Sequence, residues 1–223
     1  MKTESKKFFW IAPTLLTAFV LWTVAVCFID VSPIGPLDSA VGFSTLNGFF
    51  HHLTGVNMTL YTVTDWLGLV PIFVALGFAA LGLIQWIRRK SILKVDRSIL
   101  ALGVFYIAVM ACYMFFEIVV INYRPILIDG CQEASYPSST TLLVMCVMPT
   151  AVMQFRSRIG NAAWKRGITL AIVAFTAFMV IGRLISGVHW ITDIIGGALL
   201  SAGLVTMYAA VVSYQSGIAL RQG

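Results

Sequence analysis

The chain has 223 residues, of which 59% are hydrophobic and 11% are charged, and its formal net charge is +6. Soluble domains carry about 25% charged residues, so this chain lacks the polar side chains that would cover a surface in contact with water. The composition excludes an ordinary soluble protein and predicts an integral membrane protein. No linker or charge block divides the sequence, which predicts a single membrane-embedded domain over residues 1–223.

Six apolar segments are long enough to cross a bilayer as helices, which takes roughly 20 residues. They cover residues 8–29, 63–87, 98–121, 138–155, 168–187 and 190–214. The first is long for the core of a signal peptide, so we expect it to be retained. Between the first two spans, one apolar face can be made by Val41, Leu46, Phe49, Phe50 and Leu53. The predicted fold is all-α, a six-transmembrane-helix bundle with an interfacial helix between the first and second spans.

The basic residues are distributed unevenly between the two sides of this predicted bundle. With the N-terminus inside, thirteen of the fifteen Lys and Arg residues fall at the inner side. This asymmetry predicts that both termini are cytoplasmic, and it explains the net charge without a nucleic-acid partner. The two exceptions, Arg124 and Arg183, lie at the outer ends of spans.

Polar residues gather in three segments that this topology places on the outer face, at residues 123–125, 136–141 and 183–193. Ionisable groups at a bilayer edge are costly and mark candidate functional sites. His189 and Asp193 are four residues apart, which puts them on one face of a helix. A carboxylate beside an imidazole selects its tautomer and raises its basicity, so the other ring nitrogen becomes a candidate nucleophile or base. A purely structural pair between helices explains these two residues equally well.

The segment after Pro137 opens the fourth predicted span. Free backbone N–H groups and the helix dipole form an anion site at such a position. Its candidate phosphate-binding residues are Ser138, Ser139 and Thr140. Taken alone, the segment is explained better as an ordinary helix cap.

Arg124 and Arg183 carry guanidinium groups suited to binding two phosphate oxygens at once. Either arginine alone could instead extend toward lipid head groups. The Ser-Gly pair at residues 186–187 can end a helix between Arg183 and His189, so that both side chains aim at one point.

Together the three segments resemble the signature of the type 2 phosphatidic acid phosphatase (lipid phosphate phosphatase) family, which runs K-x6-R-P, P-S-G-H and S-R-x5-H-x3-D. The matching positions are Arg124-Pro125, Pro137-Ser138, and Arg183, His189 and Asp193 with both spacings intact. The order of the motifs and the six-span topology also agree with the family. The resemblance covers most of the chain from about residue 62 onward.

The resemblance implies a catalytic pair and a phosphate site. His189 would attack phosphorus to give a phosphohistidine, and Asp193 would orient it. Arg124, Arg183, Ser138 and neighbouring backbone N–H groups would hold the phosphoryl oxygens. No metal or other cofactor would be required.

Three family positions differ in this chain. The family's first-motif Lys is Glu117, its Gly-His pair is Ser139-Thr140, and its Ser before Arg183 is Gly182. The missing His is the family's general acid, and general acid catalysis is worth about a hundred- to ten-thousand-fold. A phosphate leaving group, as from a polyprenyl diphosphate, is a far weaker base than an alkoxide and needs little protonation, so diphosphate substrates should be affected less than monoesters.

Glu117 has three interpretations. It can pair with Arg124, two turns along one helical face, as a structural device. Burial can instead keep it protonated, so that it replaces the missing acid. It can also recruit a divalent cation together with Asp129 and Glu133. Structural pairing is the favoured interpretation.

Three functions are compatible with these residues. We expect a lipid phosphatase or diphosphatase that acts at the outer face through a phosphohistidine, with a polyprenyl diphosphate as a candidate substrate. A lipid phosphotransferase and a non-catalytic lipid-phosphate binding or translocation protein are the alternatives. The short loops and the outer-facing site suggest a bacterial plasma membrane.

Overall fold

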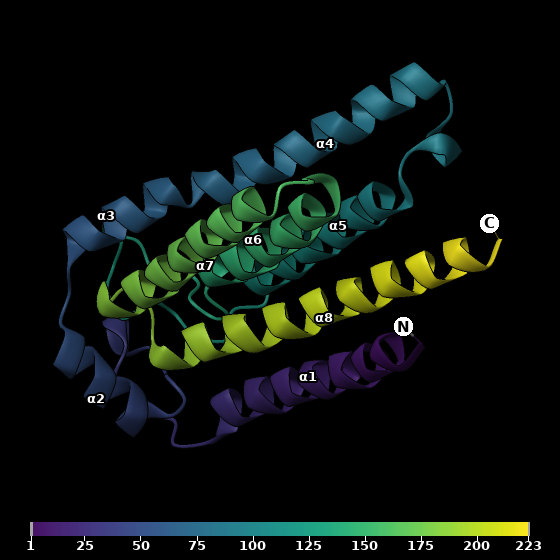
Figure 1. The fold of residues 1–223 in the computed structure, drawn as a ribbon. Coiled ribbons are helices and arrows are strands. Elements are labelled where there is room, and N and C mark those ends of the chain that lie inside the picture. The colour runs from purple at the N-terminus through teal and green to yellow at the C-terminus, as the bar shows by residue number, and fades with distance from the viewer. Residues whose placement is uncertain (1, 223) are drawn as a thin grey trace.

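The computed structural model describes the backbone of residues 2–222 and the side chains of residues 7–215. This part of the chain is helical, and its β-pairing is limited to isolated bridges. Most helices run roughly along one direction, and both ends of the chain lie at the same end of the bundle (Figure 1). The helices are α1 (Lys2–Phe28), α2 (Ser44–Thr54), α3 (Met58–Leu67), α4 (Leu69–Arg89), α5 (Arg97–Ile118), α6 (Ser139–Arg158), α7 (Ala162–Ile185) and α8 (Ile191–Gln222).

Five helical stretches within the described residues are long and apolar enough to cross a membrane. They are Lys7–Phe28, Met58–Arg89, Arg97–Ile118, Ala162–Ile185 and Ile191–Gln215. The protein is therefore an all-α integral membrane protein, as the sequence predicts. The predicted span at residues 138–155 corresponds to α6, which is not among these stretches. Because α6 packs against α4, α5, α7 and α8, it meets little lipid and has less need of an apolar surface. The sixth span stays a prediction.

The second span begins earlier than the sequence predicts. Helix α3 starts at Met58, where the Asn57 side chain accepts a hydrogen bond from the Leu60 N–H at 2.9 Å. Helix α4 follows after a break at Gly68. The additional helix matters because it carries Tyr61 and Asp65 to the arginines described below.

Helix α2 forms within the segment for which an interfacial helix was predicted. Phe49 and Leu53 are exposed on it, whereas Val41 precedes the helix and is buried. The buried amide of Asn47 donates hydrogen bonds to the Gly42 carbonyl at 2.7 Å and to Thr192 Oγ1 at 3.0 Å. Helix α2 is thus bonded to the start of α8, while its location at a membrane interface stays a prediction.

An aromatic cluster holds the chain just before α6. The Tyr136 ring stacks on Phe19 at a centroid distance of 6.3 Å, and its hydroxyl lies 2.7 Å from Thr23 Oγ1. Gly196 makes room for this ring, since a Cβ atom there would lie 2.5 Å from it. Close approach of α8 therefore positions the start of α6.

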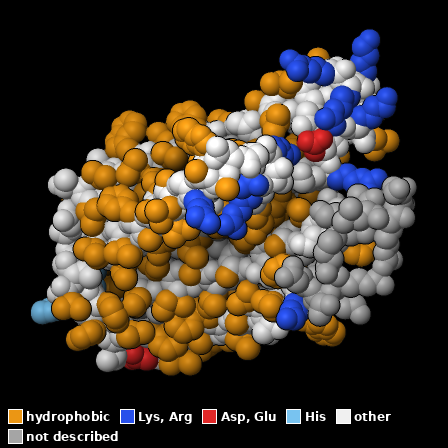
Figure 2. Space-filling view, viewed as in Figure 1, with side chains coloured by type: hydrophobic (Ala, Val, Ile, Leu, Met, Phe, Trp, Pro, Cys, Tyr) orange, Lys and Arg blue, Asp and Glu red, His pale blue; other side chains and the backbone are white. Residues whose placement is uncertain are grey.

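Lys and Arg side chains gather where α4 passes into α5, and apolar side chains cover much of the face that leads away from this end (Figure 2). The carboxylate of Asp96 organises part of this basic region. Arg89 Nη1 lies 3.0 Å from its Oδ1, and the Gln85 amide nitrogen donates to its Oδ2 at 2.9 Å. The hydrogen bond from Gln85 and the charges of Arg89 and Arg158 lower the pKa of Asp96. This basic end is the one that the sequence predicts to face the cytoplasm, and its orientation in the membrane stays a prediction.

Candidate active site

A short hairpin after α5 carries several of the candidate residues. The Arg124 N–H donates to the Glu133 carbonyl at 3.0 Å, and the Ser135 N–H donates to the Asn122 carbonyl at 2.9 Å. At the tip, Asp129 and Gly130 both have positive φ, at 49° and 77°. Asp-Gly is the sequence preferred by such a tight turn. The sequence analysis missed the hairpin, although this dipeptide signals it.

The hairpin corrects one premise about Glu117. Helix α5 ends at Ile118, not at the predicted residue 121. Arg124 therefore lies outside the helix that carries Glu117, and the two residues do not share a helical face. Its ion pair is with Glu133, whose Oε2 lies 3.0 Å from Arg124 Nε.

The segment between α7 and α8 has the predicted break. Helix α7 ends at Ile185, and Gly187 follows with a φ of 68°. A Cβ atom at Gly187 would lie 1.9 Å from the Gly55 carbonyl oxygen, so only glycine fits both the conformation and the contact. Trp190 braces the other end of the segment by donating from Nε1 to the Tyr123 carbonyl at 2.7 Å.

His189 and Asp193 are both buried, and Ser135 links them. The Ser135 hydroxyl donates to Asp193 Oδ2 at 2.5 Å and lies 3.0 Å from His189 Nδ1. The direct distance from Nδ1 to Oδ2 is 3.8 Å. Since the Ser135 hydroxyl proton points to the carboxylate, the lone pairs of the Ser135 hydroxyl oxygen can accept the Nδ1–H of His189. This arrangement leaves a lone pair on Nε2, which has no hydrogen-bond partner among the residues that the structure describes.

Two arginines converge beside this group over the ring of Tyr61. The Arg183 and Arg124 guanidinium carbons lie 4.9 Å and 5.9 Å from the ring centroid. Arg183 is almost fully buried and pairs with Asp65 at 3.6 Å. Among the described residues, Arg124 Nη1 and Arg183 Nε are buried nitrogens without a hydrogen-bond partner, as is His189 Nε2.

The charge state of His189 follows from these surroundings. Burial, and then the charges of Arg124 and Arg183, hold the pKa of His189 well below its usual range near 6.5. The imidazole is therefore neutral at physiological pH, which a nucleophile requires.

A polar cavity of about 630 Å³ adjoins the arginines. The predicted residues that line it are Glu117, Arg124, Ser139, Thr140 and Arg183. His189, Asp193 and Ser138 are buried and do not line it. The Ser138 hydroxyl accepts hydrogen bonds from the N–H and the hydroxyl of Thr141, so its side chain caps α6.

Glu117 has neither of the surroundings on which its two main interpretations rested. Its side chain is exposed within the cavity, so the burial that the acid interpretation assumed is not present. Among the ion pairs of the described residues, Arg124 pairs with Glu133 instead. The cation interpretation loses its geometry as well, because Asp129 does not line the cavity. Within the described residues no three His, Cys, Asp or Glu side chains are grouped so that they could hold a metal ion.

Sequence reasoning missed three residues of the site, Tyr61, Asp65 and Ser135. It named Glu133 only as a candidate cation ligand, not as the ion-pair partner of Arg124. Tyr61 and Asp65 lie on α3, on either side of residue 63, where the second span was predicted to begin. Ser135 is only three residues before Ser138, yet nothing in its spacing points to His189. Its role depends on the hairpin that brings it there.

Comparison with known proteins identifies the family. The model of the PAP2 superfamily matches residues 104–216, which is half of the chain and includes all three motifs. No curated protein matches the sequence. A solved structure, described as the first transmembrane PAP2 type phosphatidylglycerolphosphate phosphatase from Bacillus subtilis, is similar with a TM-score of 0.65. The similarity covers 91% of this chain and 96% of that chain at 16% identity, so it concerns the fold. The chain, with its paired His189 and Asp193 and its two converging arginines, belongs to the PAP2 superfamily.

Proposed function

We propose that the chain is a membrane lipid phosphatase or diphosphatase that works through a phosphohistidine on His189. The observation that carries the proposal is the buried Asp193–Ser135–His189 chain, which ends in a free Nε2 beside two arginines. Family membership and the phosphatase named among the solved structures support the same reaction class.

The reaction has two steps. The Nε2 lone pair attacks phosphorus, and the bond from phosphorus to the leaving oxygen breaks with its electron pair going to that oxygen. Arg124 and Arg183 stabilise the charge that develops on the phosphoryl oxygens. Asp193, acting through Ser135, stabilises the cationic ring. Water then attacks phosphorus, the P–N bond breaks, and inorganic phosphate leaves.

The leaving group decides which substrates suit this site. Thr140 lines the cavity where the resemblance places the general acid, and its hydroxyl cannot protonate an alkoxide at neutral pH. When the substrate is a lipid diphosphate, the leaving group is the lipid monophosphate, which needs little protonation. We therefore propose a lipid diphosphate, such as a polyprenyl diphosphate, as the preferred substrate.

The site is proposed to lie at the outer face of a bacterial plasma membrane, with both termini cytoplasmic. The basic side chains where α4 passes into α5, at the opposite end of α5 from Glu117, support this orientation.

Two alternatives use the same residues. A phosphotransferase would pass the phosphoryl group from His189 to a sugar or lipid hydroxyl in place of water. A non-catalytic binding or translocation protein would use the arginines alone. The free Nε2 favours catalysis over binding, since a binder has no need of an oriented imidazole.

The test is a panel of purified lipids assayed for phosphate release. We expect a lipid diphosphate to be cleaved and an alkyl phosphate monoester to be cleaved about a hundred- to ten-thousand-fold more slowly. His189→Ala should abolish release, and release by this variant at the normal rate would exclude His189 as the nucleophile. Binding without release by the folded wild type would favour the binder, and an alcohol-dependent phosphorylated product would favour the transferase.

A further inference from the structure

Hydrolysis of a phosphohistidine needs a base for the attacking water. When the water oxygen bonds to phosphorus, one of its protons must leave, and a positioned base accelerates such a step about a hundred- to ten-thousand-fold. The phosphorylated nitrogen of His189 cannot accept this proton, because its lone pair is bonded to phosphorus. The base must therefore be another side chain that borders the space where the phosphate is held.

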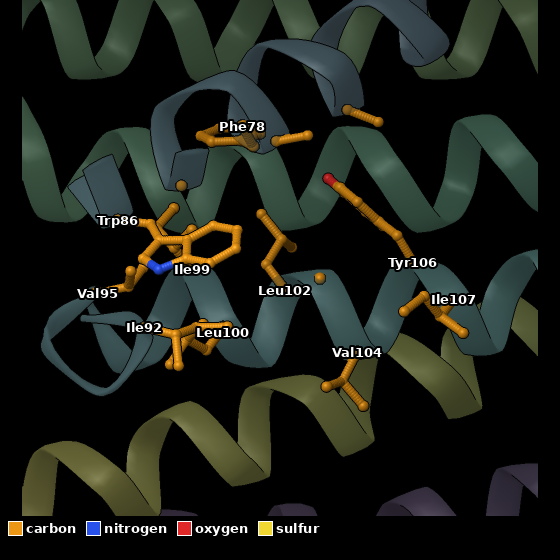
Figure 3. A pocket seen from close by; sticks show the side chains of 14 residues that line it. Phe78, Trp86, Ile92, Val95, Ile99, Leu100, Leu102, Val104, Tyr106 and Ile107 are labelled. Atoms are coloured by element: carbon orange, nitrogen blue, oxygen red, sulfur yellow. The ribbon is translucent and has the colours of Figure 1, made fainter. Parts of the chain in front are cut away.

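Two hollows of the molecule differ in whether they can supply such a base. The hollow between α4 and α5 is lined by apolar side chains such as Phe78, Ile99 and Leu102 (Figure 3). No carboxylate of the described residues lines it, so it offers no proton acceptor of this kind. The polar cavity is lined by three carboxylates, and also by Arg124 and Arg183, which are proposed to hold the phosphoryl oxygens.

The three carboxylates of the polar cavity are not equivalent. Among the types of side chain that line the cavity, carboxylates are the ones that readily accept a proton near neutral pH. Asp65 Oδ1 lies 3.6 Å from Arg183 Nη2, and Glu133 Oε2 lies 3.0 Å from Arg124 Nε. Within the part of the chain that the structure describes, no ion pair engages Glu117. Glu117 is thus the cavity carboxylate whose oxygens are not committed to a guanidinium group.

Glu117 also borders both halves of the candidate site. A smaller hollow adjoins the cavity, and four residues line both of them: Tyr113, Glu117, Ala134 and Ser139. Ser135 lines the smaller hollow, and its hydroxyl lies 3.0 Å from His189 Nδ1. Glu117 therefore borders the cavity of the two arginines and the hollow beside the His189 group.

We infer that Glu117 is the general base of the second step. The inference rests on the proposed function, because it presupposes a phosphohistidine. The Glu117 carboxylate takes one proton from the attacking water, and the water oxygen forms its bond to phosphorus. The P–N bond breaks, and its electron pair returns to Nε2 of His189 as inorganic phosphate leaves. The proton on Glu117 then passes to bulk water, since the side chain is exposed within the cavity.

Glu117→Gln should separate the two steps of the reaction. With a lipid diphosphate labelled in its terminal phosphate, the variant should release one lipid monophosphate per site at no less than the wild-type rate. The phosphoenzyme should then decay about a hundred- to ten-thousand-fold more slowly than in the wild type. The trapped label should be stable in alkali, labile in acid and absent from His189→Ala, as expected for a phosphohistidine.

The decay of the phosphoenzyme is a more direct readout than KM. The lost negative charge alone should lower KM about two- to fivefold. A slow second step lowers KM further, because phosphoenzyme accumulates at low substrate concentrations. A variant with a purely structural or electrostatic defect would change KM or stability without a selective delay in this decay.

Glu133→Gln is the matched control, because it removes one negative charge from the same cavity and keeps Glu117. Phosphoenzyme should not accumulate in this variant. Glu117→Ala with added formate tests the chemistry of the carboxylate, since formate can enter the space that the shortened side chain leaves. Formate should speed the decay of the phosphoenzyme in Glu117→Ala and have no effect on Glu133→Gln.

The outcomes separate this inference from the proposed function. A wild-type rate of decay in Glu117→Gln, equal accumulation in Glu133→Gln, or a phosphoenzyme in Glu117→Ala that formate does not affect would each overturn the role of Glu117. The proposed function would stand in all three cases, because a phosphohistidine would still have formed. If the wild type formed no phosphohistidine, the proposed function would fail, and the second step that needs a base would fail with it.

Discussion

Removing the Ser135 hydroxyl should slow catalysis without abolishing it. In Ser135→Ala the Nδ1–H of His189 loses its acceptor, and Asp193 Oδ2 keeps the Trp190 N–H at 2.9 Å. The remaining distance of 3.8 Å between Nδ1 and Oδ2 is too long for a hydrogen bond. Attraction between the cationic ring and the carboxylate persists, at about 4 kcal/mol for an effective dielectric constant near 20. The loss is therefore one hydrogen bond to a charged group, about 1.5–3 kcal/mol.

This magnitude predicts that kcat for phosphate release falls about ten- to a hundredfold while KM changes little. Ser201→Ala is the control, because Ser201 is equally buried and donates to the Gly197 carbonyl at 2.6 Å, away from the imidazole. Nitrogen NMR of the His189 ring adds a readout that needs no turnover, since the Nδ1–H tautomer should be less populated in the variant. A wild-type kcat and tautomer in Ser135→Ala, or a loss as complete as in His189→Ala, would refute the linking role.

Four further predictions concern the leaving group, the cavity charge, pH and topology. Thr140→His should raise the rate on a monoester selectively, and equal gains on monoester and diphosphate would contradict the leaving-group argument. Glu117→Gln removes an exposed charge from a phosphate cavity, so KM should fall about two- to fivefold at unchanged thermal stability; loss of the alkaline limb of the pH–rate profile would identify Glu117 as an acid instead. Because its pKa is lowered in the folded state, His189 should put the acid limb of kcat/KM below about pH 6.5. Folding stability should likewise decline as pH falls below about 6.5, since the unfolded state then binds a proton that the folded site resists. If kcat/KM and folding stability were both independent of pH down to about pH 5, His189 would not be a buried neutral imidazole. Cysteine labelling at Lys94→Cys and at the native Cys131, which is exposed, should reach only residue 131 from outside, and labelling of both from one side would overturn the topology.

The helical fold could be predicted because its signals are local. Apolar runs of about 20 residues identify spans wherever a helix faces lipid, as α5 and α7 do. Helix α6 illustrates the limit, since its neighbours shield it and the buried Thr150 and Gln154 can sit in its interior. Hydropathy measures exposure to lipid, and a helix surrounded by other helices need not be strongly apolar.

The candidate site could be predicted only in part, for a related reason. Arg183, His189 and Asp193 lie within eleven residues of each other, so their spacing is visible in the sequence. Ser135 reaches the site through the hairpin, and Asp65 reaches it through the last turn of α3. Such contacts depend on the packing of distant segments, which no local spacing encodes. For Glu117 a local spacing was instead trusted too far. The spacing of seven residues to Arg124 was interpreted as one helical face, although the helix ends before Arg124.

The segment that carries His189 is held on three sides, and this has a consequence for how substrate reaches it. Gly187 abuts the backbone at Gly55, Trp190 is bonded to Tyr123, and Thr192 is bonded to Asn47 of α2. An imidazole held in this way has little freedom to swing toward a ligand, so the reorganisation energy of the first step is low. The phosphate must instead arrive at the height in the bilayer that the bracing sets. A headgroup that holds its phosphorus farther from the hydrocarbon would keep that atom beyond the reach of His189. The depth of the proposed nucleophile in the bilayer would therefore select lipids by the distance between their phosphorus and their hydrocarbon chain.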